Sequence, residues 1–315
     1  MELFGYQNVK YDLHSEYEFS ILNESLFVQR IFENLNELWQ NDFTSLDFYV
    51  YSSHKEKRKP SSISTESSRN KVLIYLSDES GEVPEDLSAH YFAIFKSYIG
   101  DQSTCANNIF PFPLGYVKGV PQLEVKEPSE RNINVFFRGN INNNRIDFYR
   151  SFSKFKLFLP KSSTWKGVTY RKVLLRLGND FSDFFPNSIV IFNNSFKSGF
   201  SLQKYGEILS ESKIVLCPKG FDRTECFRHF EAMRAGCVLI SEKLPEIEFY
   251  KGSPILEVDN WKEGLSLAKS LIKDPFRLQQ IHEDTVNWWE NKCSEEASAN
   301  YIMNKINSLH LAPTT

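Results

Sequence analysis

Short apolar runs rich in aromatic and β-branched residues alternate with helical patterns along most of the chain. Such alternation is typical of βαβ units with a parallel sheet. In the N-terminal part, this pattern predicts strands at residues 46–52, 71–77 and 91–97. The charged, Ser-rich segment 54–70 has no apolar period, which indicates a loop. We therefore expect a small α/β domain at the N-terminus.

A second α/β domain is indicated from Ile133 onward. The pattern predicts strands at 133–139, 188–194, 213–218, 237–242 and 254–259, and helices at 143–155, 201–212, 225–236, 263–272 and 277–309. Strand, helix and strand follow one another directly over residues 213–242, so we expect a right-handed βαβ unit there.

The boundary between the domains is predicted in residues 117–132, which contain two prolines, alternating charge and no hydrophobic period. We divide the chain into domains at 1–125 and 126–290, followed by a C-terminal helix at 291–315. That helix and the preceding Trp288 and Trp289 can pack back on the first domain or touch a bilayer, and packing is the favoured alternative.

Composition narrows the function classes. The chain has 315 residues, of which 41% are hydrophobic and 24% charged, as in folded globular proteins. Its net charge of −3 gives no overall positive field, so we expect no nucleic-acid partner and only local binding of polyanions.

Cysteine usage and the N-terminal sequence indicate the compartment. Five cysteines form no C-x-x-C pair, and their odd number argues against a disulfide framework, which favours a reducing compartment. The N-terminal segment is acidic and polar, and no run of about 18 apolar residues occurs. We expect a cytoplasmic protein with at most peripheral contact at the inner face of the membrane.

Two loops of the second domain have the chemistry of anion sites, because ligands of doubly wound sheets bind beyond strand ends and at helix N-termini. Each loop taken alone is more simply explained as an ordinary turn. Because both loops occur in one domain, phosphate binding and an ordinary turn become equal alternatives. The candidate donor-binding residues are Arg138, Gly139 and Asn140 in the first loop, and Lys219, Gly220 and Arg223 in the second.

The predicted helix 225–236 carries a second set of candidates. Arg228 and Glu231 are three residues apart and so share a helix face. One interpretation is a surface salt bridge. The other is that Glu231 binds ribose hydroxyls while Arg228 neutralises a diphosphate. His229 is expected to point away from this face and to be structural.

These residues carry a resemblance to a known family. Residues 205–245 are similar to the C-terminal signature of exostosin-like glycosyltransferases, with C-P-x-G at 217–220, R-x-x-E-A at 228–232 and G-C at 236–237. Cys226 stands where the family usually has Ser. Segments 110–116 and 134–145 are similar to further family segments, so the resemblance covers about residues 105–260.

The resemblance implies a GT-B architecture, in which two Rossmann-like domains face a cleft. The second domain would bind a nucleotide-sugar donor and the first a saccharide or lipid-linked saccharide acceptor, without a cofactor or an essential metal. The sequence also lacks the D-x-D pair with which metal-dependent glycosyltransferases hold a divalent cation. Cations would then stabilise the leaving diphosphate, with Arg138, Lys219, Arg223 and Arg228 as candidates.

Family members of this type mostly invert the anomeric centre, which requires a general base. Asp78 is the first candidate and Glu79 the second, because both directly follow the apolar strand predicted at 71–77. The alternative is a solvated acidic turn, since the sequence SDESG is also good turn chemistry.

The expected function is a hexosyl- or pentosyltransferase of surface polysaccharide biosynthesis, such as O-antigen or capsule assembly. Two alternatives remain open: a transferase that uses a CMP-sugar or a phosphorylated ribose donor, and a non-catalytic protein that binds nucleotides or sugars.

Overall fold

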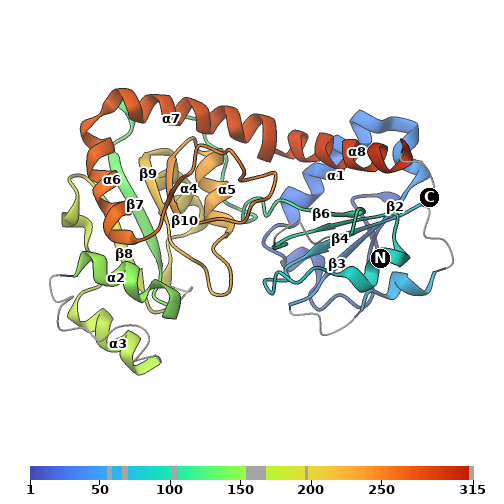
Figure 1. Cartoon of the computed structure of the whole chain (residues 1–315), viewed down its shortest axis with the longest axis horizontal. Coiled ribbons are helices and arrows are strands. Elements are labelled where there is room, and N and C mark those ends of the chain that lie inside the picture. The colour runs from blue at the N-terminus through green and yellow to red at the C-terminus, as the bar shows by residue number, and fades with distance from the viewer. Residues whose placement is uncertain (55–58, 66–69, 101–105, 154–167, 196–197, 312–315) are drawn as a thin grey trace. The chain divides into compact units, whose positions relative to one another are not determined.

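The computed structural model describes residues 1–54, 59–65, 70–100, 106–153, 168–195 and 198–311 (Figure 1). The chain divides into two compact units. Unit 1 comprises Met1–Lys118, Pro245–Lys251 and Glu290–Thr315, and unit 2 comprises Gly119–Leu244 and Gly252–Trp289. The division after Lys118 lies earlier in the chain than the expected boundary at residue 125.

Unit 1 is built on a six-stranded sheet with the order β1-β2-β3-β4-β5-β6. β1 pairs antiparallel with β2, and the remaining neighbours are parallel. The strands are β1 (Glu2–Leu3), β2 (Tyr6–Tyr11), β3 (Asp47–Ser52), β4 (Lys71–Leu76), β5 (Ala93–Lys96) and β6 (Ile109–Pro111). The three strands predicted in this region are confirmed as β3, β4 and β5, whereas β1, β2 and β6 were not predicted.

Two helices of unit 1 pack against each other although they lie far apart in the sequence. These are α1 (Ser25–Trp39) and α8 (Glu295–Leu311). Apolar side chains of α1 recur at helical spacing and are buried, among them Phe27, Ile31 and Leu35. At one end of the contact, Arg30 Nη1 lies 3.2 Å from Glu295 Oε1.

Unit 2 has a five-stranded, fully parallel sheet with the order β11-β10-β9-β7-β8. Its strands are β7 (Ile133–Asn140), β8 (Ile189–Asn193), β9 (Ser212–Cys217), β10 (Val238–Glu242) and β11 (Leu256–Val258). Its helices are α2 (Ile146–Phe152), α3 (Val168–Leu177), α4 (Leu202–Ser210), α5 (Phe227–Arg234), α6 (Trp261–Lys273) and α7 (Pro275–Trp288). The predicted alternation of strands and helices is confirmed here with small shifts at the element ends, but α3 was not predicted, and the helix expected over 277–309 is divided between α7 and α8.

The strand order of unit 2 reverses direction between β7 and β9. From β7 the chain first adds β8 on one side, and it then returns to add β9, β10 and β11 on the other side. Such a topological switch point leaves a crevice beyond the carboxyl ends of the two central strands. The two loops singled out in the sequence follow β7 and β9 at this point.

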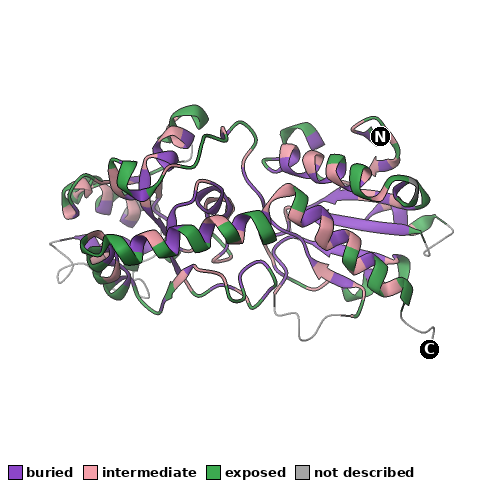
Figure 2. Cartoon of the chain, turned by 90° about the horizontal axis from the view of Figure 1, so that it is seen from above, coloured by how far each residue is buried: buried purple, intermediate pink, exposed green. Residues whose placement is uncertain are grey.

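Aromatic packing accounts for much of the phenylalanine in unit 2. Phe137 from β7 packs edge-on against Phe148 from α2, with ring centroids 4.8 Å apart. Trp261 contacts the same Phe148 ring at 4.3 Å. Figure 2 shows that the strands are mostly buried, while the helices also present exposed faces. Within the described residues, no helix is both long and apolar enough to cross a membrane.

Candidate functional site

The two predicted anion loops of unit 2 are joined by hydrogen bonds. Asn142 Nδ2 donates to the carbonyl oxygen of Gly220 at 3.2 Å. Asn144 Nδ2 donates to the same oxygen at 3.1 Å and to the Phe221 carbonyl at 2.5 Å. These two asparagine amides hold the loop after β9 against the loop after β7.

Arg145 is a central residue that the sequence reasoning missed. Its side chain is buried, and Nε donates to the Lys219 carbonyl at 2.8 Å while Nη1 donates to the Asn140 carbonyl at 3.0 Å. Burial and the nearby Arg228 cation lower the pKa of Arg145 to about 10. The guanidinium therefore remains charged at neutral pH and supplies a fixed positive charge at the switch point.

Arg228 projects from the first turn of α5 to the same point. Its Nη2 donates to the Arg138 carbonyl at 2.6 Å, and its Cζ lies 4.9 Å from the ring centroid of Phe137. Nε and Nη1 are buried and have no hydrogen-bond partner among the described residues. Buried donors without partners are costly in a native protein unless a ligand or water meets them.

Gly139 lies between the guanidinium groups of Arg145 and Arg228. A Cβ atom at this position would lie 3.0 Å from Arg145 Nη1 and 3.1 Å from Arg228 Nη2. Both distances are shorter than an ordinary van der Waals contact. The absence of a side chain at Gly139 therefore allows the two guanidinium groups to approach the end of β7.

The other predicted cations lie around this centre. The guanidinium of Arg138 stacks on Phe200, with Cζ 3.7 Å from the ring centroid, and Nη2 donates to the Ser198 carbonyl at 2.5 Å. Gly220 N donates to the Arg223 carbonyl at 2.8 Å and closes a tight turn. Lys219 and Arg223 are both partly exposed.

Glu231 is buried one turn further along α5. Tyr205 from α4 donates its hydroxyl to Glu231 Oε2 at 2.9 Å. Burial, together with the negative charge of Glu231, raises the pKa of Tyr205 far above its ordinary value, so the phenol stays a donor. Tyr205 was not predicted, because it lies on another helix 26 residues earlier.

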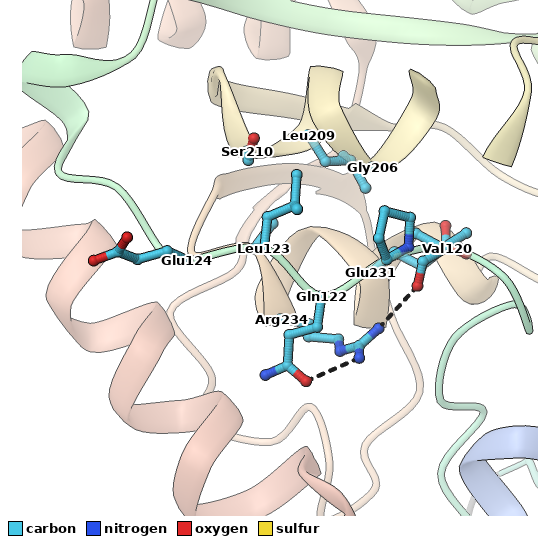
Figure 3. A pocket seen from close by; sticks show the side chains of 11 residues that line it. Val120, Gln122, Leu123, Glu124, Gly206, Leu209, Ser210, Glu231 and Arg234 are labelled. Atoms are coloured by element: carbon cyan, nitrogen blue, oxygen red, sulfur yellow. Dashed lines mark hydrogen bonds between the residues drawn. The ribbon is translucent and has the colours of Figure 1, made fainter. Parts of the chain in front are cut away.

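A small cavity beside Glu231 is shown in Figure 3. Its volume of about 20 Å³ has room for one water molecule, and far too little for a nucleotide. At its edge, Arg234 Nη1 donates to the Val120 carbonyl at 3.4 Å, and Nη2 donates to Gln122 Oε1 at 3.0 Å (Figure 3). These bonds attach residues 120–122 to α5, which explains why unit 2 begins at Gly119.

The two candidate bases of unit 1 lie in different surroundings. Asp78 has no exposed surface, and its Oδ2 lies 3.0 Å from the Nζ of the equally buried Lys96. Burial alone would raise the pKa of Asp78, but Lys96 and hydrogen bonds from Ser80 bring it below its ordinary value. Glu79, the next residue, is partly exposed. Asp78 thus has the surroundings of a structural ion pair, and Glu79 is the one of the two candidate bases that is partly exposed.

Another carboxylate at this sheet edge was missed by the sequence reasoning. Glu24 is buried, and its Oε1 accepts a hydrogen bond from Ser77 Oγ at 2.9 Å. Burial raises the pKa of Glu24. Ser77 itself directly follows β4 with a φ of 66°, in the left-handed region that non-glycine residues rarely adopt. In the described part of the chain, no group of three or more His, Cys, Asp or Glu side chains is placed to hold a metal ion.

Comparisons with known proteins rest on structure alone. No family model matches the chain, and no curated protein matches its sequence. The crystal structure of α,α-trehalose 6-phosphate synthase from Burkholderia multivorans is similar, with a TM-score of 0.50, 9% identity, and coverage of 92% of this chain and 77% of that one. The chain has the GT-B fold. The expected class of two Rossmann-like domains is thereby confirmed.

A second GT-B structure is similar over a smaller part of this chain. It is Anabaena Alr3699/HepE in complex with UDP and glucose, with a TM-score of 0.47, 11% identity, and coverage of 76% of this chain and 72% of that one. At these identities the likeness concerns the fold. The resemblance of residues 205–245 to the exostosin-like family therefore stays a prediction.

Proposed function

We propose that this GT-B protein is a glycosyltransferase that uses a nucleotide-sugar donor bound at the switch point of unit 2. The observation that carries the proposal is the pair of cations beside Gly139, the buried Arg145 and the partly buried Arg228, with two buried donor nitrogens of Arg228 unmet. A diphosphate satisfies such donors with charge-assisted hydrogen bonds, which are about twice as strong as neutral ones.

Each predicted donor residue has a role in this proposal. Arg228 binds the diphosphate. Gly139 has no side chain, so the diphosphate can come close to the backbone there. Lys219 and Arg223 neutralise the outer phosphate oxygens as the leaving group develops charge. Glu231, held by Tyr205, accepts hydrogen bonds from the ribose hydroxyls. Arg138, Asn140 and Gly220 shape the two loops through backbone groups.

Catalysis in this proposal is inverting and requires no metal, because protein cations replace the divalent ion. Glu79 is the general base, since Asp78 is buried and paired with Lys96. The acceptor is a saccharide or lipid-linked saccharide of a surface polysaccharide, as the exostosin-like resemblance suggests. Transfer that persists in the presence of a chelator tests the metal-free mechanism.

A thermal-shift screen tests donor binding directly. The intact protein is heated with UDP, GDP, CMP, ADP and UDP-glucose, and a ligand at 100 times its Kd should add about 2.7 kcal/mol of stability. Arg228→Ala should abolish the shift, whereas Arg277→Ala, at an exposed arginine of α7, should retain it. A shift unaltered by Arg228→Ala would place the nucleotide elsewhere, and no shift with any nucleotide would contradict the proposal.

A further inference from the structure

Cys226 differs from the other cysteines that the structure describes. Cys217, Cys237 and Cys293 are completely buried, whereas Cys226 is partly exposed. It forms the N-cap of α5, and its Sγ lies 3.4 Å from Nδ1 of His229. A thiol within reach of an imidazole is the arrangement of an activated sulfur nucleophile.

The hydrogen bonds of His229 fix which ring nitrogen faces the thiol. His229 Nε2 lies 2.9 Å from Ser241 Oγ. The single Ser241 hydroxyl proton is directed to backbone carbonyls, at 2.8 Å for Glu242 and 3.2 Å for Cys217, so this oxygen accepts from Nε2–H. Nδ1 therefore carries the lone pair.

The same nitrogen can receive and hold the thiol proton. Nδ1 accepts the backbone N–H of Cys226 at 3.2 Å and faces the Cys226 thiol. Once protonated, Nδ1–H has the Cys226 carbonyl oxygen as an acceptor at 3.2 Å. Cys226, His229 and Ser241 thus form a nucleophile, a base and a residue that orients the base.

The charged and titratable groups facing Cys226 come from three elements. They are His229 and Arg228 on α5, Arg145 from the loop after β7, and Cys217 at the end of β9. Burial disfavours the thiolate, but His229, Arg228 and Arg145 outweigh it and lower the pKa of Cys226 to about 7. About half of the thiol is then ionised at neutral pH, against about one hundredth for a thiol with the ordinary pKa of 9.0.

We propose that Cys226 is a site of thiol–disulfide exchange with anionic low-molecular-weight disulfides, and that the resulting mixed disulfide blocks the neighbouring donor site. His229 takes the thiol proton, and the Cys226 thiolate attacks one sulfur of the disulfide. A new S–S bond forms at Cys226 while the old one breaks, and the other half leaves as a thiolate. Cys226 is thereby oxidised and the departing half is reduced.

The surroundings of Cys226 also select the charge of the disulfide. Arg145 and Arg228 attract a carboxylate-bearing molecule and repel a cationic one. The second part of the proposal rests on the proposed function, because the adduct blocks nucleotide binding only if Arg228 contributes to the donor site. The adduct would be attached two residues before Arg228.

The exchange reaction is measured on a Cys105→Ser chain, since Cys105 lies outside the described residues. Oxidised glutathione should add one glutathione per chain, mapped by peptide mass to Cys226, and cystamine at the same concentration should react more slowly. At pH 6 the thiolate fraction of Cys226 is about 100 times that of an ordinary thiol. A thiolate of lower pKa is also less nucleophilic, which reduces the rate about tenfold. We therefore expect a rate about tenfold above that of an ordinary thiol.

Variants separate this mechanism from mere exposure of the sulfur. Cys226→Ser should abolish the adduct, and His229→Gln should move the midpoint of the pH–rate profile upward. Ser241→Ala should move it in the same direction, and it serves as the second variant if His229→Gln does not fold. Modification at another cysteine, equal rates with cystamine, or unchanged pH profiles in both folded variants would overturn the exchange site.

Nucleotide binding then tests the blocking step. The thermal shift given by a nucleotide should disappear after glutathione addition and return after reduction with dithiothreitol. A shift that persists in the fully modified protein would overturn the blocking step alone. If no nucleotide stabilises the unmodified protein, the proposed function fails, whereas the adduct mapped to Cys226 still decides the exchange site.

Discussion

Arg228 Nη2 lies 2.6 Å from the carbonyl oxygen of Arg138, so the first turn of α5 is tied to the end of β7. This bond and the Phe137 ring near Cζ orient the guanidinium, while Nε and Nη1 make no hydrogen bond to the described residues. A cation held in this way needs little reorganisation to bind an anion, which is the condition for strong electrostatic stabilisation of a leaving group.

Gly139→Ala should weaken nucleotide binding by about tenfold, or 1.4 kcal/mol. The added Cβ would lie within 3.1 Å of both Arg145 Nη1 and Arg228 Nη2, so at least one guanidinium must move. Gly178→Ala is the matched control, since its Cβ would meet only Phe181 at the ordinary distance of 3.6 Å. Calorimetric titration measures both variants, and equal affinities would show that the two cations do not contact the ligand.

The sequence indicated the positions of these loops but not their internal bonds. Strand β7, strand β9 and helix α5 have strong apolar patterns, so the ends that position Arg138, Lys219 and Arg228 were predictable. The role of Arg145 was not predictable, because it depends on carbonyl groups more than 70 residues later in the chain. A pattern based on local periodicity contains no information on such pairings.

The lack of information on distant pairings also explains why Asp78 was the first candidate for the general base. A turn sequence after an apolar strand predicts an accessible carboxylate, and the sequence SDESG fits this rule. Its partner Lys96 lies at the end of β5, inside a run that was identified only as a strand. The parallel pairing of β4 with β5 brings these two residues together, and this register cannot be derived from either segment alone.

Asp78→Asn should lower the free energy of unfolding by about 3 kcal/mol, because it leaves the buried Lys96 without its counter-charge. The pKa of Asp78 is lowered in the folded state, so its stabilising contribution is present above the unfolded-state pKa and is lost as the pH falls through the folded-state pKa. Urea unfolding at neutral pH measures the loss.

The matched control for Asp78 is Asp47→Asn, at a surface pair with Lys10 in which both side chains are more than 40% exposed. A pair of this kind contributes at most about 1 kcal/mol. Equal effects of the two substitutions would mean that the Asp78–Lys96 pair does not stabilise unit 1.

Glu79→Gln should reduce turnover by about 10²–10⁴-fold if Glu79 is the general base, because the amide keeps the size of the side chain but cannot accept the proton. Nucleotide affinity should be unchanged, since the proposed donor residues all belong to unit 2. Glu82→Gln, at an exposed carboxylate three residues later, is the control. Turnover above about one tenth of the parental value would assign the base to another group.

Glu24→Gln should stabilise the protein at neutral pH, because burial raises the pKa of Glu24 and an amide at this position need not ionise. The pKa of Glu24 is raised by burial, so its favourable contribution is present below the unfolded-state pKa and is lost as the pH rises through the folded-state pKa.

Glutamine mimics the protonated carboxyl, and its Oε1 can still accept the hydrogen bond from Ser77. The difference between variant and parent should therefore be small near pH 4 and grow toward pH 7 in urea unfolding. Glu37→Gln, at an exposed position of helix α1, which begins directly after Glu24, should give no such trend. A stability difference for Glu24→Gln that does not change with pH would show that this carboxyl is ionised without penalty in the folded state.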